Sequence, residues 1–134
     1  MVKTIGAGVV AFCLLAVLPA LAAAEDDANR ALYLRYCGAC HGPQGKGDGV
    51  ASSLLRPKPT DLTQLAKKNR GEFPYMRVVR VIDGRETKRA HGDAAMPVWG
   101  EIFQDQASWT QAQRAETQGK IQQITDYLHT VQAK

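Results

Sequence analysis

Apolar residues recur at helical spacing along this chain, and no segment alternates apolar and polar residues as a half-buried β-strand does. The first such stripe predicts a helix over residues 27–36, with Asp26 or Asp27 as its N-cap. The apolar members of the stripe are Leu32, Tyr33 and Tyr36.

Two further helices are predicted in the middle of the chain. The glycine-rich run from residue 42 to residue 49 is a loop, and Pro57 and Pro59 keep the following stretch extended. Thr60 or Asp61 then caps a short helix that ends near Gly71. The next helix opens with Pro74 in its first turn and stops at Gly84. Its apolar residues are Met76, Val78, Val79, Val81 and Ile82.

The C-terminal part predicts a short helix at residues 99–103 and a long final helix that begins near Thr110. Thr110 and Gln113 form a T-x-x-Q capping box. Gly119 interrupts the helix at a cost of about 1 kcal/mol and marks a close crossing or a bend. The apolar face is formed by Ile121, Ile124, Leu128 and Val131, with Tyr127 beside it. The predicted architecture is all-α.

The N-terminus has the features of an export signal. Lys3 precedes an apolar run that is broken by Pro19 and ends in small residues at 22–24, which predicts a signal peptide over residues 1–24 that is cleaved. The alternative is an uncleaved anchor, because the run has about 20 apolar residues, barely enough to span a membrane. Cleavage would leave residues 25–134 as one exported domain.

A domain of this size buries a marginal core without help. Cys13 leaves with the signal, and the two remaining cysteines, Cys37 and Cys40, are too close in sequence to staple a fold. A large apolar cofactor would supply the missing core.

Charge is unevenly distributed. The predicted mature chain has 16 Lys and Arg against 13 Asp and Glu, a net side-chain charge of +3, whereas Arg56–Ala90 alone carries +6. This basic segment is either a solvated surface or a docking face for an acidic redox partner. Nucleic-acid binding is not expected, because no basic stretch is interleaved with aromatic residues.

The most informative residues are Cys37-Gly38-Ala39-Cys40-His41. C-x-x-C-H is typical of a c-type haem attachment site. Two thiols at this spacing reach the two vinyl groups on one edge of the macrocycle, and the next residue places an imidazole under the iron. A structural zinc site needs more ligands than this cluster offers, and a thioredoxin-like motif needs a βαβ pattern that the sequence lacks.

The predicted mature chain resembles the class I cytochrome c family. The likeness rests on Tyr33 four residues before C-G-A-C-H, on the run C-H-G-P-Q-G-K-G-D-G, on M-P-V-W-G, and on an amphipathic last helix that ends in Y-L. It implies three to five helices around one covalently bound haem c. It also implies a crossing of the first and last helices, with Tyr33 against Ile124 and Tyr127. Asn29 departs from the family pattern, which has a small residue there, so Ala28 or Ala31 is expected at the crossing.

The resemblance also implies the axial ligands, His41 and Met96. Pro97 suits this role because it removes a backbone donor and prevents a helix, which holds Met96 in a loop across the second haem face. Met76, in an apolar helical run, is expected in the core. His91 is the alternative ligand, in a bis-His site.

Weaker expectations concern the surroundings of the haem. A metal-bound histidine usually donates its other N–H to a carbonyl or carboxylate, and the resemblance implies a proline carbonyl, that of Pro57 or Pro59. Trp99 either donates its indole N–H to a haem propionate or only packs. His129 is expected at the surface near the last carbonyls of the final helix.

These observations predict a periplasmic one-electron carrier, not an enzyme, that works as a monomer and is not bound to a membrane after cleavage. Its partners would be a redox protein donor and acceptor. The alternatives are a cytochrome subunit of a dehydrogenase or oxidase complex, and a peroxidase-like haem enzyme or ligand sensor with an open iron position.

Overall fold

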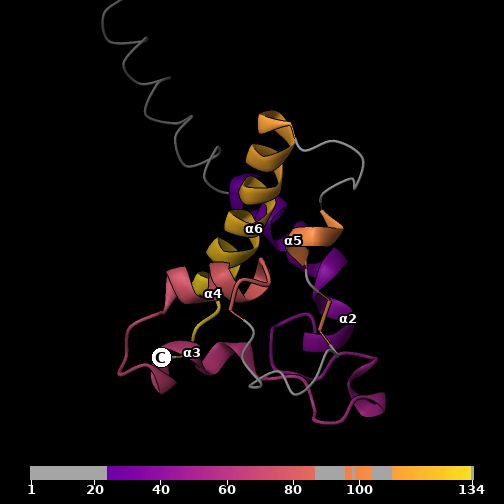
Figure 1. Ribbon diagram of the computed structural model, residues 1–134. Coiled ribbons are helices and arrows are strands. Elements are labelled where there is room, and N and C mark those ends of the chain that lie inside the picture. Colours follow the sequence, from indigo (N-terminus) through magenta and orange to yellow (C-terminus); the bar gives the residue numbers. More distant parts are fainter. Residues whose placement is uncertain (1–23, 87–95, 98, 104–109, 134) are drawn as a thin grey trace, which may run out of the picture.

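The computed structural model describes residues 24–86, 96–97, 99–103 and 110–133. Within these ranges every regular element is a helix, and no residue lies in a β-strand (Figure 1). The predicted all-α class is therefore confirmed. No helix in this part of the chain is long and apolar enough to cross a membrane. Nearly all of the predicted signal peptide, residues 1–23, lies outside the described part.

Within the described part of the chain the first helix covers residues 24–36, and after a turn at Cys37 the chain continues into the short α2 (Gly38–His41). The prediction that Asp26 or Asp27 caps the first helix is wrong, because both residues lie within it. The alanine and glutamate that precede them are good helix formers, so the helix extends beyond the expected cap.

Between α2 and α4 (Tyr75–Ile82) the chain is mostly irregular, as predicted. The side chain of Asp61 caps the 3₁₀ turn that begins at Leu62, since its Oδ1 accepts the backbone N–H of Thr63 at 2.9 Å. The predicted short helix is present as a 3₁₀ turn that leads into one α-helical turn, and Gly71 follows it in a left-handed conformation. The elements in order are η1 (Ser52–Leu54), η2 (Leu62–Gln64) and α3 (Leu65–Lys68).

Helix α4 (Tyr75–Ile82) follows Pro74, as predicted, and buries Val78 and Ile82. Met76 is 61% exposed, so its expected place in the core is wrong. Side chains two positions apart on an α-helix point about 200° apart around its axis. The helix buries the face that carries Val78, and Met76 is therefore turned toward solvent.

The predicted helices near the C-terminus are present as α5 (Trp99–Ile102) and α6 (Gln111–Thr130). The capping box is confirmed: the backbone N–H of Gln113 donates to Thr110 Oγ1, and the N–H of Thr110 donates to Gln113 Oε1 at 3.0 Å. A Cβ on Gly119 would have no atom within 4 Å, so the close crossing considered for it is wrong. The predicted apolar face is buried at Ile121, Ile124, Tyr127 and Leu128 and half-buried at Val131.

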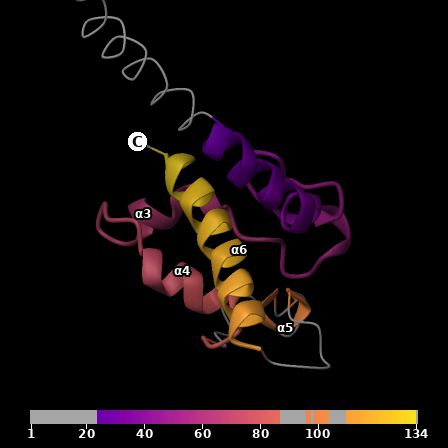
Figure 2. The same cartoon turned by 90° about the horizontal axis from the view of Figure 1, so that it is seen from above.

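The core lies between the first helix, α6 and α4. Figure 2 shows the first helix along one side of α6 and α4 on the other. The rings of Tyr33 and Tyr127 lie 4.7 Å apart, which confirms the predicted contact between the first and last helices. Ala28 and Ala31 are exposed, whereas Asn29 is buried, so the expectation that an alanine replaces it at the inner position is wrong.

Candidate functional site

Two adjoining cavities, of about 380 Å³ and about 60 Å³, lie between α2, the proline-containing stretch and α4. Four residues line both: Cys37, His41, Thr60 and Met96. The larger cavity has a volume in the range typical of ligand pockets. Its apolar walls are formed by Leu62, Leu65, Val78, Val81, Ile82, Ile124 and Leu128.

The His41 side chain is oriented by a hydrogen bond across the cavity wall. It is buried, and its Nδ1 lies 2.9 Å from the carbonyl oxygen of Thr60. A carbonyl only accepts, so Nδ1–H is the donor, and in the neutral ring Nε2 then carries the lone pair that a metal would use.

The acceptor is thus Thr60, and the prediction that the carbonyl of Pro57 or Pro59 plays this part is wrong. The Pro59 carbonyl lies against Gly47 instead. The approach is so close that a Cβ added at Gly47 would collide with the carbonyl oxygen. The next carbonyl along the chain is the one that reaches His41. Pro57 and Pro59 nevertheless line the smaller cavity.

The two cysteines of the motif are free thiols that face the cavities. Cys37 is buried and lines both cavities, whereas Cys40 is half-buried and lines the smaller one. Burial, with a smaller contribution from Cys40, raises the pKa of the Cys37 thiol to about 12. The Cys37 sulfur is therefore protonated at neutral pH.

The glycine-rich loop is folded tightly onto α2. The backbone N–H groups of Gly47, Gly49 and Ala51 donate to the carbonyls of His41, Cys40 and Ala39 at 2.8, 3.2 and 2.9 Å. A Cβ on Gly49 would collide with the Ala39 carbonyl, so this position requires glycine. The loop therefore provides partners for the C-terminal carbonyls of α2 and holds the motif in place.

Two tyrosines, which the sequence analysis had identified only as helix-crossing residues, also hold this loop. The hydroxyl of Tyr33 donates to the carbonyl of Gly42 at 2.7 Å, and that of Tyr127 donates to the carbonyl of Pro43 at 3.1 Å. Burial raises the pKa of Tyr33 well above its ordinary value, so its phenol stays a donor. These hydrogen bonds could have been anticipated, because both tyrosines were expected at the buried helix crossing and a buried tyrosine hydroxyl usually has a hydrogen-bond partner.

Met96, far along the chain from the motif, lies in the same wall as His41. Pro97 and Trp99 line the smaller cavity beside it, and the Trp99 ring packs edge-on against Tyr36 with centroids 5.3 Å apart. The alternative ligand His91 lies outside the described residues. His129 is exposed, as expected, and stacks on Phe73 at 4.9 Å.

Three basic side chains line the cavities, and no sequence pattern had identified any of them as a site residue. Lys58 lines the smaller cavity, and Lys68 and Arg77 line the larger one. Among the described residues, no group of three or more His, Cys, Asp or Glu side chains is placed to hold a metal ion by itself.

In comparisons with known proteins, no family model, no curated protein and no solved structure matches this chain.

Proposed function

We propose that this protein is a periplasmic one-electron carrier with a cytochrome c fold and one covalent haem c, bound through Cys37 and Cys40. The observation that carries the proposal is the meeting of Cys37, His41 and Met96 in the walls of two adjoining cavities, with Cys40 in one of them. Local sequence places Cys37, Cys40 and His41 together, but only folding brings Met96 to them.

The side chains present fit a haem c. Cys37 and Cys40, both free thiols, would hold the group through two thioether bonds, the S–H of each thiol being added across one vinyl group. The Thr60 carbonyl holds His41 in the tautomer that suits a metal ligand, and Met96 offers a soft sulfur donor. When bound, the group supplies a reversible Fe(II)/Fe(III) couple. The apolar wall keeps water away from it.

This donor set favours an electron carrier over a haem enzyme or a ligand sensor. His41 and Met96 would both serve as iron ligands, and iron held in this way would have no position open to a substrate. Thioether sulfur and a low-polarity surrounding stabilise the ferrous state and raise the reduction potential.

A transient partner is supported by the surface beside α2. Val50 and Leu54 are 91% and 83% exposed, and η1, which contains Leu54, packs against α2. Arg56 and Lys58 follow in the chain and are exposed. An apolar centre with basic neighbours close to the cysteine edge suits a short-lived contact with an acidic redox protein.

The proposal is tested first by mass and by visible spectroscopy of the purified protein. We expect a chain that begins near Glu25, with a mass greater than that of the peptide by one haem, resistant to acid-acetone extraction. Extractable haem, no haem, or a retained N-terminus would contradict the respective part of the proposal.

The sixth ligand is tested by substitution. Met96→Ala should abolish the weak near-infrared sulfur-to-iron absorption of the ferric protein, lower the reduction potential and admit small ligands. Met76→Leu is the matched control and should change none of these, because that side chain is 61% exposed on α4. If His91→Ala loses low-spin ligation while Met96→Ala keeps it, the site is bis-His.

A further inference from the structure

The charged side chains that line the two cavities within the described part of the chain are all cationic. Lys58, Lys68 and Arg77 line the cavities, and no Asp or Glu is among the described residues that line either of them. An apolar cavity edged by cations favours a ligand that is apolar over most of its surface and anionic at one end.

Lys68 and Arg77 lie on a different cavity from the Cys40 end of the C-G-A-C-H motif. Cys40 lines only the smaller cavity, and Arg77 and Lys68 line only the larger one, while Cys37 and His41 line both. Arg77 and Lys68 therefore line the part of the site that Cys40 does not reach. In a haem, the two carboxylate-bearing propionates are on the edge opposite the two vinyl groups.

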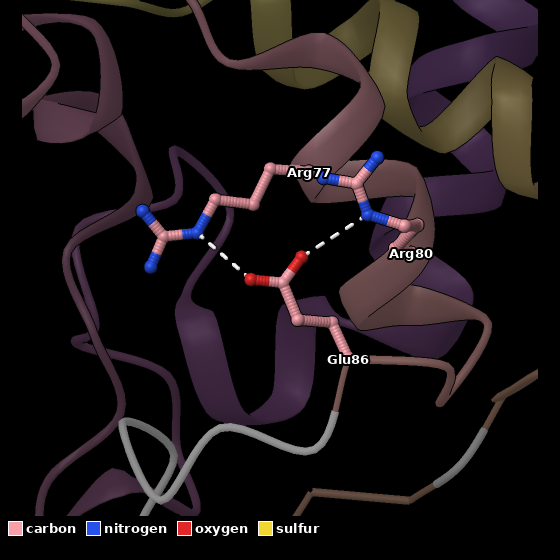
Figure 3. Close-up of polar contacts among 3 residues, drawn as sticks. All are labelled: Arg77, Arg80 and Glu86. Atoms are coloured by element: carbon pink, nitrogen blue, oxygen red, sulfur yellow. Dashed lines mark hydrogen bonds and ion pairs between the residues drawn. The ribbon is translucent and has the colours of Figure 1, made fainter.

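Arg77 already has one acidic neighbour, but that neighbour is shared. The Glu86 carboxylate lies between Arg77 and Arg80, with Oε1 3.4 Å from Arg77 Nε and Oε2 3.2 Å from Arg80 Nε. Figure 3 shows each Nε facing the carboxylate and the terminal NH₂ groups of Arg77 directed away from it. Two guanidinium groups on one carboxylate leave a surplus of one positive charge.

Among the described residues, the acidic side chain that directly follows α4, Asp83, does not cancel that surplus. Asp83 forms an ion pair with Arg85. The turn after α4, in which the N–H groups of Arg85 and Glu86 both donate to the Arg80 carbonyl, returns the chain toward the helix and brings Glu86 to the arginines. A second carboxylate beside Arg77 would therefore complete the pairing.

We propose that Arg77, assisted by Lys68, binds a propionate carboxylate of the haem and raises its reduction potential, with Glu86 orienting the guanidinium. This inference rests on the proposed function. Arg77 is the binding residue, and Glu86 is a positioning residue that acts through it.

The structure offers a matched control in Arg80. Both arginines lie on α4, both contact Glu86, and their side chains are similarly exposed, at 46% and 50%. Of the two, Arg77 lines the larger cavity described above, and Arg80 lines neither of the two cavities. The loss of a surface charge or of the Glu86 contact should therefore have the same effect when either arginine is replaced. The loss of a bound carboxylate should have an effect only when Arg77 is replaced.

The experiment is a spectroelectrochemical titration of the haem-containing full chain carrying Arg77→Gln, Arg80→Gln or Arg77→Lys. We expect Arg77→Gln to lower the potential, with roughly a two- to tenfold fall in the ferrous-to-ferric ratio at fixed ambient potential. Arg80→Gln should shift it clearly less, and Arg77→Lys should retain most of the wild-type value. The ferric haem-methyl NMR shifts should change in Arg77→Gln and not in Arg80→Gln.

The inference would be overturned if the reduction potential fell equally in Arg77→Gln and Arg80→Gln. It would also be overturned if the potential of Arg77→Lys were as low as that of Arg77→Gln. That failure is distinguishable from failure of the proposed function, because intact mass reports the covalent haem separately. If Arg77→Gln does not fold, Arg77→Lys against Arg80→Lys provides the same comparison, with a changed haem-methyl pattern expected only for the former and an unchanged pattern overturning the inference.

Discussion

Replacing Tyr33 by phenylalanine isolates one contact that holds the loop after His41. The substitution removes only the hydroxyl that donates to the Gly42 carbonyl at 2.7 Å. Tyr33 is 0% exposed and Gly42 is buried as well, so water cannot replace the lost donor. The Gly42 carbonyl keeps a second donor, the backbone N–H of Gly45 at 3.1 Å, so the expected loss of unfolding free energy is that of one buried hydrogen bond, about 1–1.5 kcal/mol.

Tyr127→Phe is the matched control. Its hydroxyl donates to the carbonyl of the next residue, Pro43, at 3.1 Å, but Pro43 is exposed. Water can therefore satisfy that carbonyl after the substitution, and the expected cost is about 0.5–1 kcal/mol. The two rings are in contact and hold adjacent carbonyls, so the double variant should differ from the sum of the single variants by about 0.5 kcal/mol or more.

The assay is urea unfolding of the haem-containing full chain. A loss of about 1 kcal/mol with a slope of about 2 kcal/mol per molar moves the midpoint by about 0.5 M. An unchanged midpoint in Tyr33→Phe, or a larger loss in Tyr127→Phe than in Tyr33→Phe, would refute the reasoning that burial of the acceptor decides the cost.

Three further outcomes follow from particular residues. Gly119→Ala in α6 should raise the unfolding free energy by about 0.5–1 kcal/mol, because the added Cβ meets no neighbour; a loss measured by thermal unfolding would contradict this. Burial, then the hydrogen bond to Asp126, raises the pKa of Tyr75 from 10.0 to about 12. The folded chain thus holds this proton more tightly, so the stabilisation is fully present below pH 10.0 and is lost as pH rises toward about 12. Tyr75→Phe should flatten that part of the pH–stability curve, and an unchanged slope would count against it. If Arg56–Ala90 docks an acidic partner, the electron-transfer rate should fall as ionic strength rises, and a rate indifferent to salt would leave the segment as a solvated surface.

Features that depend on neighbours in the chain could be predicted from the sequence. The capping box of Thr110 and Gln113, the cap at Asp61 and the turn between α2 and η1 each depend on a few adjacent residues, and all are present. The apolar face of α6 also follows from spacing alone, because helical geometry places those residues on one side. The C-G-A-C-H motif belongs to the same class, since its three chemical groups lie within one turn.

Features that depend on which surfaces pack together were decided by the tertiary structure. Periodicity could not tell that Met76 faces solvent, because an apolar run around α4 leaves open which side meets α6. The choice of Thr60 over Pro57 and Pro59 as the His41 acceptor depends on how the extended stretch lies against the glycine loop.

The candidate site combines both kinds of information. The sequence by itself determined the two thiols and the imidazole, because their spacing along one helical turn already sets their relation. Only the tertiary structure placed Met96 in the same cavity walls and put Arg77, but not Arg80, on the rim. The physical reason is that contacts between distant segments follow from burial of whole faces, which depends on every element that packs there and not on the residues beside each one.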